Sequence, residues 1–151
     1  MEASPRPLHI LLADDDADDR SFFEEALTEV PVSSTLTTLE DGQKLMDFLA
    51  EIRHPPPPDL IFLDINMPCK NGKVCLKEIR SNRKFEDVPV IMFSTSSQQR
   101  DIDEAYSDGA NLYISKSVFF EDDVNILKRL LAINWKEYQP KPGKKRFVLG
   151  L

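Results

Sequence analysis

The chain of 151 residues contains little cysteine, histidine or glycine. Its two cysteines, Cys69 and Cys75, form no Cys-x-x-Cys pair and have no histidine cluster nearby, which argues against structural zinc and a disulfide framework. Only five residues are glycine, and none lies in the turn Asp14–Asp19 after the first expected strand. A nucleotide- or flavin-binding domain would need a glycine-rich turn there, so we discount that class.

The sequence also lacks a long apolar run and an excess of positive charge. No run approaches the length that crosses a membrane, and residues 1–7 lack the apolar core of a signal peptide. We therefore expect a cytoplasmic protein without membrane contact. The formal net charge of -7 argues against binding to nucleic acid. The length and the hydrophobic content of 41% suit one domain with its own core.

Five short apolar or β-branched segments alternate with five segments of helical spacing. The expected strands are Leu8–Ala13, Thr35–Leu39, Leu60–Leu63, Pro89–Phe93 and Leu112–Ile114. The third strand has no polar alternation, which indicates burial on both faces of a parallel sheet. Among the side chains expected on the inward stripes of the helices are Phe22, Leu45, Val74, Ile102, Val124 and Trp135. The alternation predicts an α/β fold, a doubly wound parallel sheet with helices on both faces.

Acidic residues follow the first and third expected strands. Asp16 or Asp18 can cap the first helix, but capping does not explain Asp14 and Asp15, which come before it. Asp64 directly follows the central strand. An aspartate in that place can simply turn the loop, but it also stands where open α/β sheets keep their chemistry.

Ser94 and Lys116 follow the fourth and fifth strands, and therefore belong to the same edge of the sheet. Converging carboxylates repel one another unless a cation offsets their charge. A hard divalent ion such as Mg²⁺ and the ammonium of Lys116 would both serve. This set is suited to phosphoryl transfer, with Asp64 as the nucleophile, Lys116 neutralising phosphoryl oxygens and Ser94 donating a hydrogen bond to one of them.

Four motifs make the chain resemble the receiver domains of bacterial two-component response regulators over residues 8–132. They are Leu11–Asp16, Phe62–Pro68, Phe93–Thr95 and Tyr113–Lys116. The resemblance implies a flavodoxin-like (βα)5 fold with a five-stranded sheet in the order 2-1-3-4-5. It further implies that Asp64 accepts a phosphoryl group from a phosphohistidine of a sensor histidine kinase.

The resemblance also implies a cofactor, Mg²⁺ or Mn²⁺, and its ligands. Asp15, the phosphorylated Asp64 and the backbone carbonyl of Asn66 match the positions that hold the ion. Asp14 matches the acidic residue that contacts it through water.

Other positions match residues that grip the phosphoryl group or respond to it. Ser94 and Lys116 match the hydroxyl and the lysine that hold its oxygens, and Tyr113 matches the aromatic switch residue that moves inward together with that hydroxyl. Asn66 and Ser96 match positions that flank the phosphoryl group and tune its lifetime. We expect the switch to shift a population of conformations rather than to create a new one.

Two features depart from the common pattern. Ser117 stands where the family usually has a proline after the lysine, which leaves the placement of Lys116 open and suggests slower phosphorylation or a shorter-lived product. No output domain is evident, so we expect a receiver domain at 1–135 and a C-terminal tail at 136–151, frayed or docked through Phe147–Leu149.

We expect Ser97 to cap the helix after the fourth strand.

The chain is similar to the stand-alone receivers that serve bacterial phytochromes. This similarity implies a kinase of that type. It also implies a downstream protein or a homodimer contact through the face of the fourth helix, fifth strand and fifth helix.

Two other functions remain open: a phosphate-independent interaction module, which the Ser117 departure favours, and a small phosphatase with Asp14 as nucleophile in Asp14-Asp15-Asp16. The second lacks an evident substrate cap, and we expect a signalling domain rather than an enzyme.

Overall fold

A computed structural model describes residues 7–51, 58–135 and 147–149 of the chain. Within them, a single parallel sheet has the strand order β2-β1-β3-β4-β5-β6. The strands are β1 (Leu8–Ala13), β2 (Ser34–Leu39), β3 (Leu60–Leu63), β4 (Val90–Ser94), β5 (Leu112–Ser115) and β6 (Val148–Leu149). The flavodoxin-like order 2-1-3-4-5 is confirmed, and β6 extends the sheet beyond the five strands expected.

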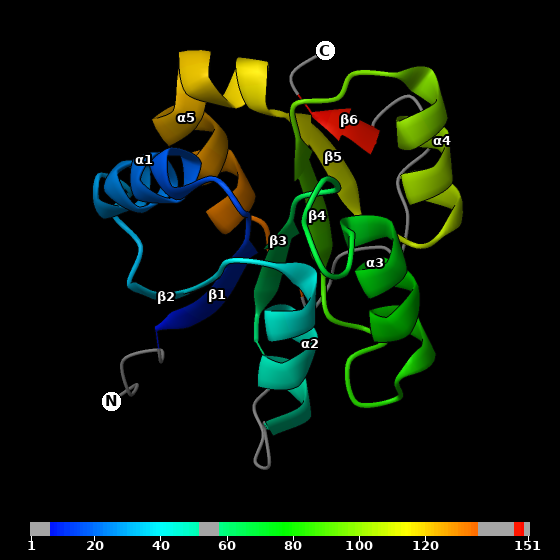
Figure 1. Cartoon of the computed structure of the whole chain (residues 1–151). Helices are drawn as coiled ribbons and strands as arrows, with labels where there is room; N and C mark the ends of the chain where they lie inside the picture. Colours follow the sequence, from blue (N-terminus) through cyan, green and yellow to red (C-terminus); the bar gives the residue numbers. More distant parts are fainter. Residues whose placement is uncertain (1–6, 52–57, 136–146, 150–151) are drawn as a thin grey trace.

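The helices of the described chain cover both faces of this sheet (Figure 1). They are α1 (Ala17–Thr28), α2 (Gly42–Glu51), α3 (Gly72–Ser81), α4 (Gln99–Ser107) and α5 (Lys116–Leu131). α1 and α5 pack on one face, and α2, α3 and α4 pack on the other. Because β1 to β5 run parallel, their carboxyl ends meet at one edge of the sheet.

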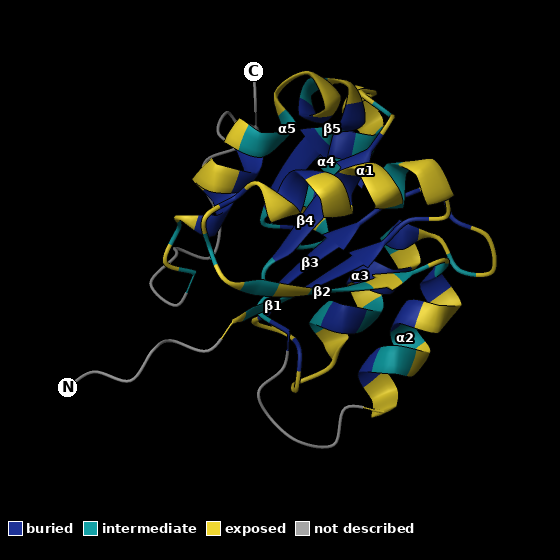
Figure 2. Cartoon of the chain, turned by 90° about the vertical axis from the view of Figure 1, so that its left-hand side faces the viewer, coloured by how far each residue is buried: buried dark blue, intermediate teal, exposed yellow. Residues whose placement is uncertain are grey.

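The sheet divides the hydrophobic core into two layers, since successive side chains of a strand point to opposite faces. In β1, Ile10 and Leu12 pack toward α1 and α5, whereas Leu11 and Ala13 belong to the layer under α2, α3 and α4. Every residue of β3 is buried, as its unbroken apolar run predicts (Figure 2). The central strands therefore form a rigid support for the residues at their carboxyl ends.

Two side chains predicted to face inward are exposed. Val74 in α3 is 41% exposed, and Phe22 in α1 is 39% exposed. The buried stripe of α3 includes Cys75, Leu76 and Ile79, and that of α1 contains Phe23, Ala26 and Leu27. Val74 and Phe22 each precede their stripe by one residue, which turns them about 100° away from it around the helix axis.

The fifth helix ends earlier than predicted, at Leu131. It begins at Lys116 because Phe119 is fully buried and packs on the aromatic rings of the core, which holds the first turns against the sheet. Its backbone is non-helical at Asp122, with φ -141° and ψ 40°. Trp135 lies beyond the helix end, where its Nε1 donates a hydrogen bond to the Leu130 carbonyl oxygen at 3.1 Å.

The last described residues dock on the sheet. Val148 pairs with Tyr113 in β5, so β6 covers the edge of that strand. Phe147 is fully buried, and its ring centre lies 5.2 Å from that of Tyr106 and 6.3 Å from that of Tyr113. The tail was expected to be either frayed or docked, and residues 147–149 are docked. The rest of the expected tail, 136–146 and 150–151, lies outside the described residues.

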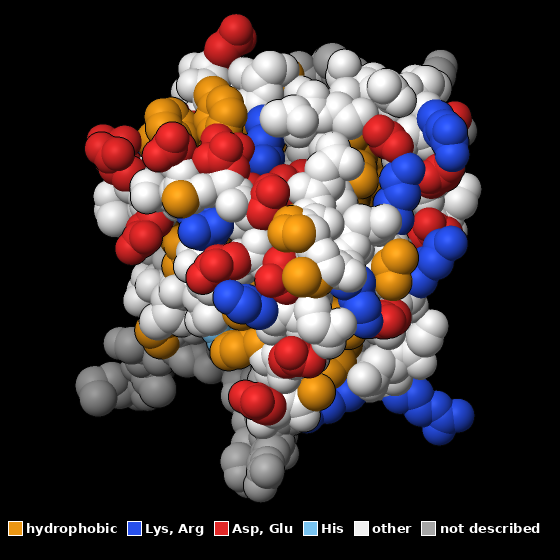
Figure 3. Space-filling view, viewed as in Figure 1, with side chains coloured by type: hydrophobic (Ala, Val, Ile, Leu, Met, Phe, Trp, Pro, Cys, Tyr) orange, Lys and Arg blue, Asp and Glu red, His pale blue; other side chains and the backbone are white. Residues whose placement is uncertain are grey.

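Charged side chains are unevenly distributed over the face drawn in Figure 3. Acidic side chains gather over α1, whereas basic and acidic side chains intermix over α3 and α4. None of the helices within the described ranges is long and apolar enough to cross a membrane.

Candidate functional site

Four buried polar side chains meet at the carboxyl-terminal edge of the sheet. Asp14 follows β1, Asp64 follows β3, Ser94 ends β4, and Lys116 begins α5 directly after β5. None of the four is more than 4% exposed. Charged groups are seldom buried to this extent unless they compensate one another or serve a function. The structure thus brings together the strand-end residues that the sequence singled out.

The ammonium of Lys116 contacts three carboxylates. Its Nζ lies 2.8 Å from Asp14 Oδ2, 2.9 Å from Asp19 Oδ2 and 3.1 Å from Asp64 Oδ2. It also lies 5.4 Å from the centre of the Phe93 ring. Burial alone would lower the pKa of Lys116, but the close contacts of its ammonium with the Asp14 and Asp19 carboxylates raise that pKa above its usual value. The side chain is therefore a fixed positive charge at neutral pH.

The surrounding carboxylates outnumber this positive charge. Burial raises the pKa of Asp64 to about 6, in spite of the neighbouring Lys116. Burial raises the pKa of Asp14 as well. Asp14 Oδ2 is ion-paired with Lys116 but accepts no well-aligned hydrogen bond from any described residue. The buried acids therefore have too little positive charge around them.

Asp15 completes a set of oxygen atoms that suits a divalent cation. Carboxylate oxygens of Asp14, Asp15 and Asp64 all lie within 4.8 Å of one another. Asp15 is exposed while the other two are buried, so the set is accessible from solvent. Hard divalent ions prefer oxygen ligands, and such an ion would offset the uncompensated charge. These residues fit the Mg²⁺ or Mn²⁺ that the sequence predicts.

The loop after Asp64 is held by the start of α3. The Gly72 amide donates to the Ile65 carbonyl oxygen at 2.8 Å, and Asn71 caps α3 by accepting from the Val74 amide at 3.0 Å. A Cβ on Gly72 would lie 2.0 Å from the Asp64 carbonyl oxygen, so only glycine allows this approach. Asn66, in the same loop, is exposed.

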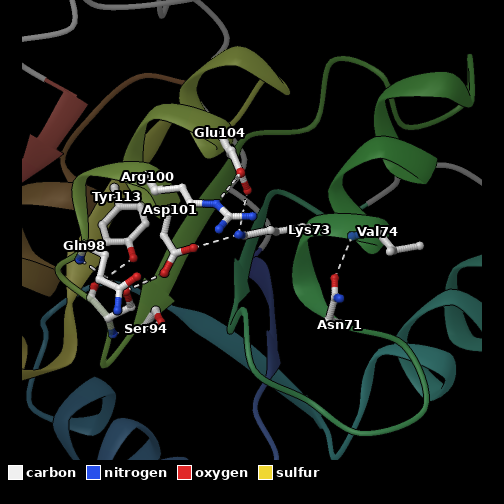
Figure 4. Close-up of polar contacts among 10 residues, drawn as sticks. Asn71, Lys73, Val74, Ser94, Gln98, Arg100, Asp101, Glu104 and Tyr113 are labelled. Atoms are coloured by element: carbon white, nitrogen blue, oxygen red, sulfur yellow. Dashed lines mark hydrogen bonds and ion pairs between the residues drawn. The ribbon is translucent and has the colours of Figure 1, made fainter.

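A chain of hydrogen bonds joins Ser94 to α4 and α3 (Figure 4). Ser94 Oγ accepts from the Ser96 amide at 3.1 Å, and the Tyr113 hydroxyl donates to the Ser96 carbonyl oxygen at 2.8 Å. Ser96 Oγ in turn donates to Asp101 Oδ2 at 2.5 Å, and Lys73 donates to Asp101 Oδ1 at 2.6 Å. The side chains expected to respond to a phosphoryl group are therefore connected to the first turn of α4.

The start of α4 differs from prediction. Gln98 occupies the N-cap position without a side-chain cap, so the prediction that Ser97 caps this helix is wrong. The Ser96 hydroxyl accepts from the Gln98 amide at 3.2 Å instead. Ser96 thereby takes over part of the capping role while it is bonded to Asp101.

Comparison with known proteins identifies the family. The response regulator receiver domain family matches residues 10–130. The chain belongs to this family. It is 35% identical over 124 residues to the response regulator Rcp1 of Synechocystis sp., covering 80% of this chain and 84% of that protein.

Solved receiver structures have the same fold. The Mn²⁺-bound form of Rcp1 matches with a TM-score of 0.75 at 31% identity, covering 91% of this chain and all of that one. The phosphorylated cyanobacterial phytochrome response regulator RcpA matches with a TM-score of 0.75 at 34% identity, covering 83% of this chain and 91% of that one. The protein is thus a signalling receiver domain of the two-component type, in which a divalent metal and a kinase partner are expected.

The receiver site contains three residues that sequence reasoning missed, namely Asp19, Lys73 and Asp101. The sequence showed Asp19 only as one acid of a first helical turn, whereas in the structure it reaches Lys116. Lys73 and Asp101 lie on different helices, at helix surfaces where most charged residues face water. No local pattern distinguishes such residues, because their partners are distant in the sequence.

Proposed function

We propose that Asp64 accepts a phosphoryl group from the phosphohistidine of a sensor histidine kinase. The observation that carries this proposal is the burial of Asp64 beside the Lys116 ammonium, at 3.1 Å, within reach of the Asp14 and Asp15 carboxylates. A carboxylate with incomplete charge compensation at a strand end suits nucleophilic attack on a phosphoryl group.

In the transfer, a carboxylate oxygen of Asp64 forms a bond to phosphorus as the bond from phosphorus to the histidine nitrogen breaks. The imidazole leaves and regains its proton from solvent. Lys116 donates a hydrogen bond to one phosphoryl oxygen, and Ser94 Oγ donates a hydrogen bond to another. Asp15, Asp64 and the backbone carbonyl of Asn66 would hold Mg²⁺ or Mn²⁺, with Asp14 contacting the ion through water, and the ion would supply positive charge to the same oxygens.

Phosphorylation then changes a surface for protein contact. Ser94 and Tyr113 would act as the switch, because both bond to Ser96, which is tied to α4 through Asp101. The contact face would comprise α4, β5 and α5. In this structure β6 pairs with β5 and covers part of its edge. Asn66 and Ser96 would tune the lifetime of the product.

The names of the relatives support a phytochrome-type kinase as the donor. We further propose a receiver domain at 1–135 that is followed by a tail at 136–151. In this role the domain works in the cytoplasm through protein partners and turns over no separate substrate. A downstream protein or a second copy of the chain would read the switched face.

The acceptor residue can be identified chemically. After incubation with acetyl phosphate and Mg²⁺, borohydride reduces an aspartyl phosphate to homoserine, which peptide mass mapping locates. We expect homoserine at position 64 and nowhere else. Homoserine at position 14 would instead support the phosphatase-type alternative, in which repeated turnover of a small substrate should also be measurable.

A further inference from the structure

Asp19 contacts Lys116, but it is neither the proposed phosphoryl acceptor nor one of the residues whose oxygens could hold a metal ion. Its Oδ2 lies 2.9 Å from Lys116 Nζ and accepts a hydrogen bond from it. The oxygens that could hold a cation come from Asp14, Asp15 and Asp64, and Asp19 is not among them. The role of Asp19 is therefore not explained by the site as the family defines it.

The position of Asp19 is fixed by the first turn of α1. Asp16 is the N-cap of this helix, and its Oδ1 accepts from the Asp19 amide at 3.0 Å. The Arg20 side chain donates to the Asp14 carbonyl oxygen at 2.7 Å, which ties the same turn to the end of β1. Residues on a helix that is anchored at both its cap and its neighbouring strand hold their side chains with little freedom.

The flexible side chain of Lys116 needs a fixed partner that holds its ammonium in place. A lysine ammonium has three hydrogens on a flexible stem, and here they face three carboxylates. Phosphorylation converts the Asp64 carboxylate into an acyl phosphate, and Asp14 would share its charge with a metal ion. Among the three described carboxylates around Lys116, Asp19 would be neither phosphorylated nor shared with a metal ion.

We propose that Asp19 is a positioning residue for Lys116, and that it holds the ammonium in place for the phosphoryl oxygens in a receiver where Ser117 replaces the usual proline. This inference rests on the proposed function of Asp64. A group held in advance where charge develops accelerates transfer because little reorganisation is needed at the moment of reaction.

The test compares Asp19→Asn with a matched control, Asp18→Asn. Asp18 lies in the same helical turn and is exposed, and its side chain makes no hydrogen bond or ion pair with the described residues. Both variants remove one negative charge near the site, but only Asp19→Asn removes the contact with Lys116. Acetyl phosphate with Mg²⁺ is the donor, since a kinase could itself touch α1 and confuse the comparison.

We expect Asp19→Asn to lower the first-order labelling rate about tenfold relative to Asp18→Asn. Mn²⁺ affinity, measured separately, should be the same in the two variants, because neither residue is a ligand. Asp19→Glu should recover most of the rate, since a carboxylate can again reach Lys116. If Asp19→Asn fails to fold, Asp19→Ala, which favours the helix, replaces it.

Equal labelling rates in Asp19→Asn and Asp18→Asn would overturn the proposal, and so would a loss of rate that Asp19→Glu does not recover. Asp64→Asn separates this failure from failure of the proposed function. Label retained in Asp64→Asn means that Asp64 is not the acceptor. Label lost in Asp64→Asn but unaffected by Asp19→Asn means that the acceptor is right and the positioning role is wrong.

Discussion

Lys73 in α3 reaches across to α4, where its Nζ lies 2.6 Å from Asp101 Oδ1. The same ammonium lies 2.6 Å from Glu104 Oε2, one turn farther along α4. Asp101 also accepts from the Ser96 hydroxyl, so this ion pair ends a chain of contacts that begins at Ser94. The two carboxylates raise the pKa of Lys73 through hydrogen bonds.

Lys73→Met should lower the free energy of unfolding by about 1 kcal/mol, because the pair is only partly shielded from water. Urea titration in low salt measures this, and the difference should shrink in high salt. Lys77→Met is the matched control, since Lys77 is exposed on the same helix and has no ion pair within the described ranges. Equal stability of the two variants would show that the bridge contributes nothing.

Tyr113→Phe should remove the hydrogen bond to the Ser96 carbonyl oxygen and keep the buried ring. We expect a loss of about 1 kcal/mol in the free energy of unfolding, the usual net contribution of one such bond. The same variant should still be phosphorylated on Asp64, because the hydroxyl of Tyr113 bonds to Ser96 and no hydrogen bond joins it to Asp64 among the described residues. Loss of labelling would mean that Tyr113 acts in the transfer itself rather than in the response to it.

Much of the fold could be predicted because the chain repeats one local pattern, a short apolar strand followed by a segment of helical spacing. The limits of β1 and β3 were predicted correctly, since each is an apolar run ending at an aspartate. The meeting of Asp14, Asp64, Ser94 and Lys116 followed from the geometry of parallel strands and needed no side-chain detail. Topology alone placed these residues.

What could not be predicted depends on contacts between distant segments. The sequence near Phe147 is basic and rich in proline and glycine, and only the edge of β5 makes Val148–Leu149 a strand. The Asp19 contact with Lys116 joins residues 97 positions apart. Val74 and Phe22 show a smaller limit, because spacing identifies the apolar stripe but not which residue at its border is covered.

Asp64→Asn should stabilise the protein at pH 7 in the presence of a chelator. The pKa of Asp64 is raised to about 6 in the folded state from an ordinary value of 3.8, so the folded state binds this proton more tightly than the unfolded state does. The contribution is favourable at low pH and is lost as pH rises through about 6. We expect the variant to gain about 1–3 kcal/mol at pH 7 and much less at pH 4.

Urea titrations of both proteins across this pH range check the sign. A wild-type protein that becomes more stable, relative to Asp64→Asn, as pH rises from 4 to 7 would contradict the account of Asp64 as a poorly compensated buried carboxylate.

Asp15→Ala should weaken binding of Mg²⁺ and Mn²⁺ about tenfold or more, because it removes a charged oxygen from the proposed ligand set. Asp15 is exposed, so the metal-free fold should be as stable as that of the control Asp18→Ala. Calorimetric titration with each ion measures the affinity. Metal binding that is unchanged in Asp15→Ala would exclude this residue as a ligand.

The central claim is that Asp64 is a metal-dependent phosphoryl acceptor. Intact-protein mass after incubation with acetyl phosphate tests it most directly, in three samples: wild type with Mg²⁺, wild type with chelator, and Asp64→Asn with Mg²⁺. We predict a single phosphoryl increment in the first sample and none in the other two. No increment in the first sample, under conditions that preserve acyl phosphates, or an increment that persists in Asp64→Asn, would contradict the claim.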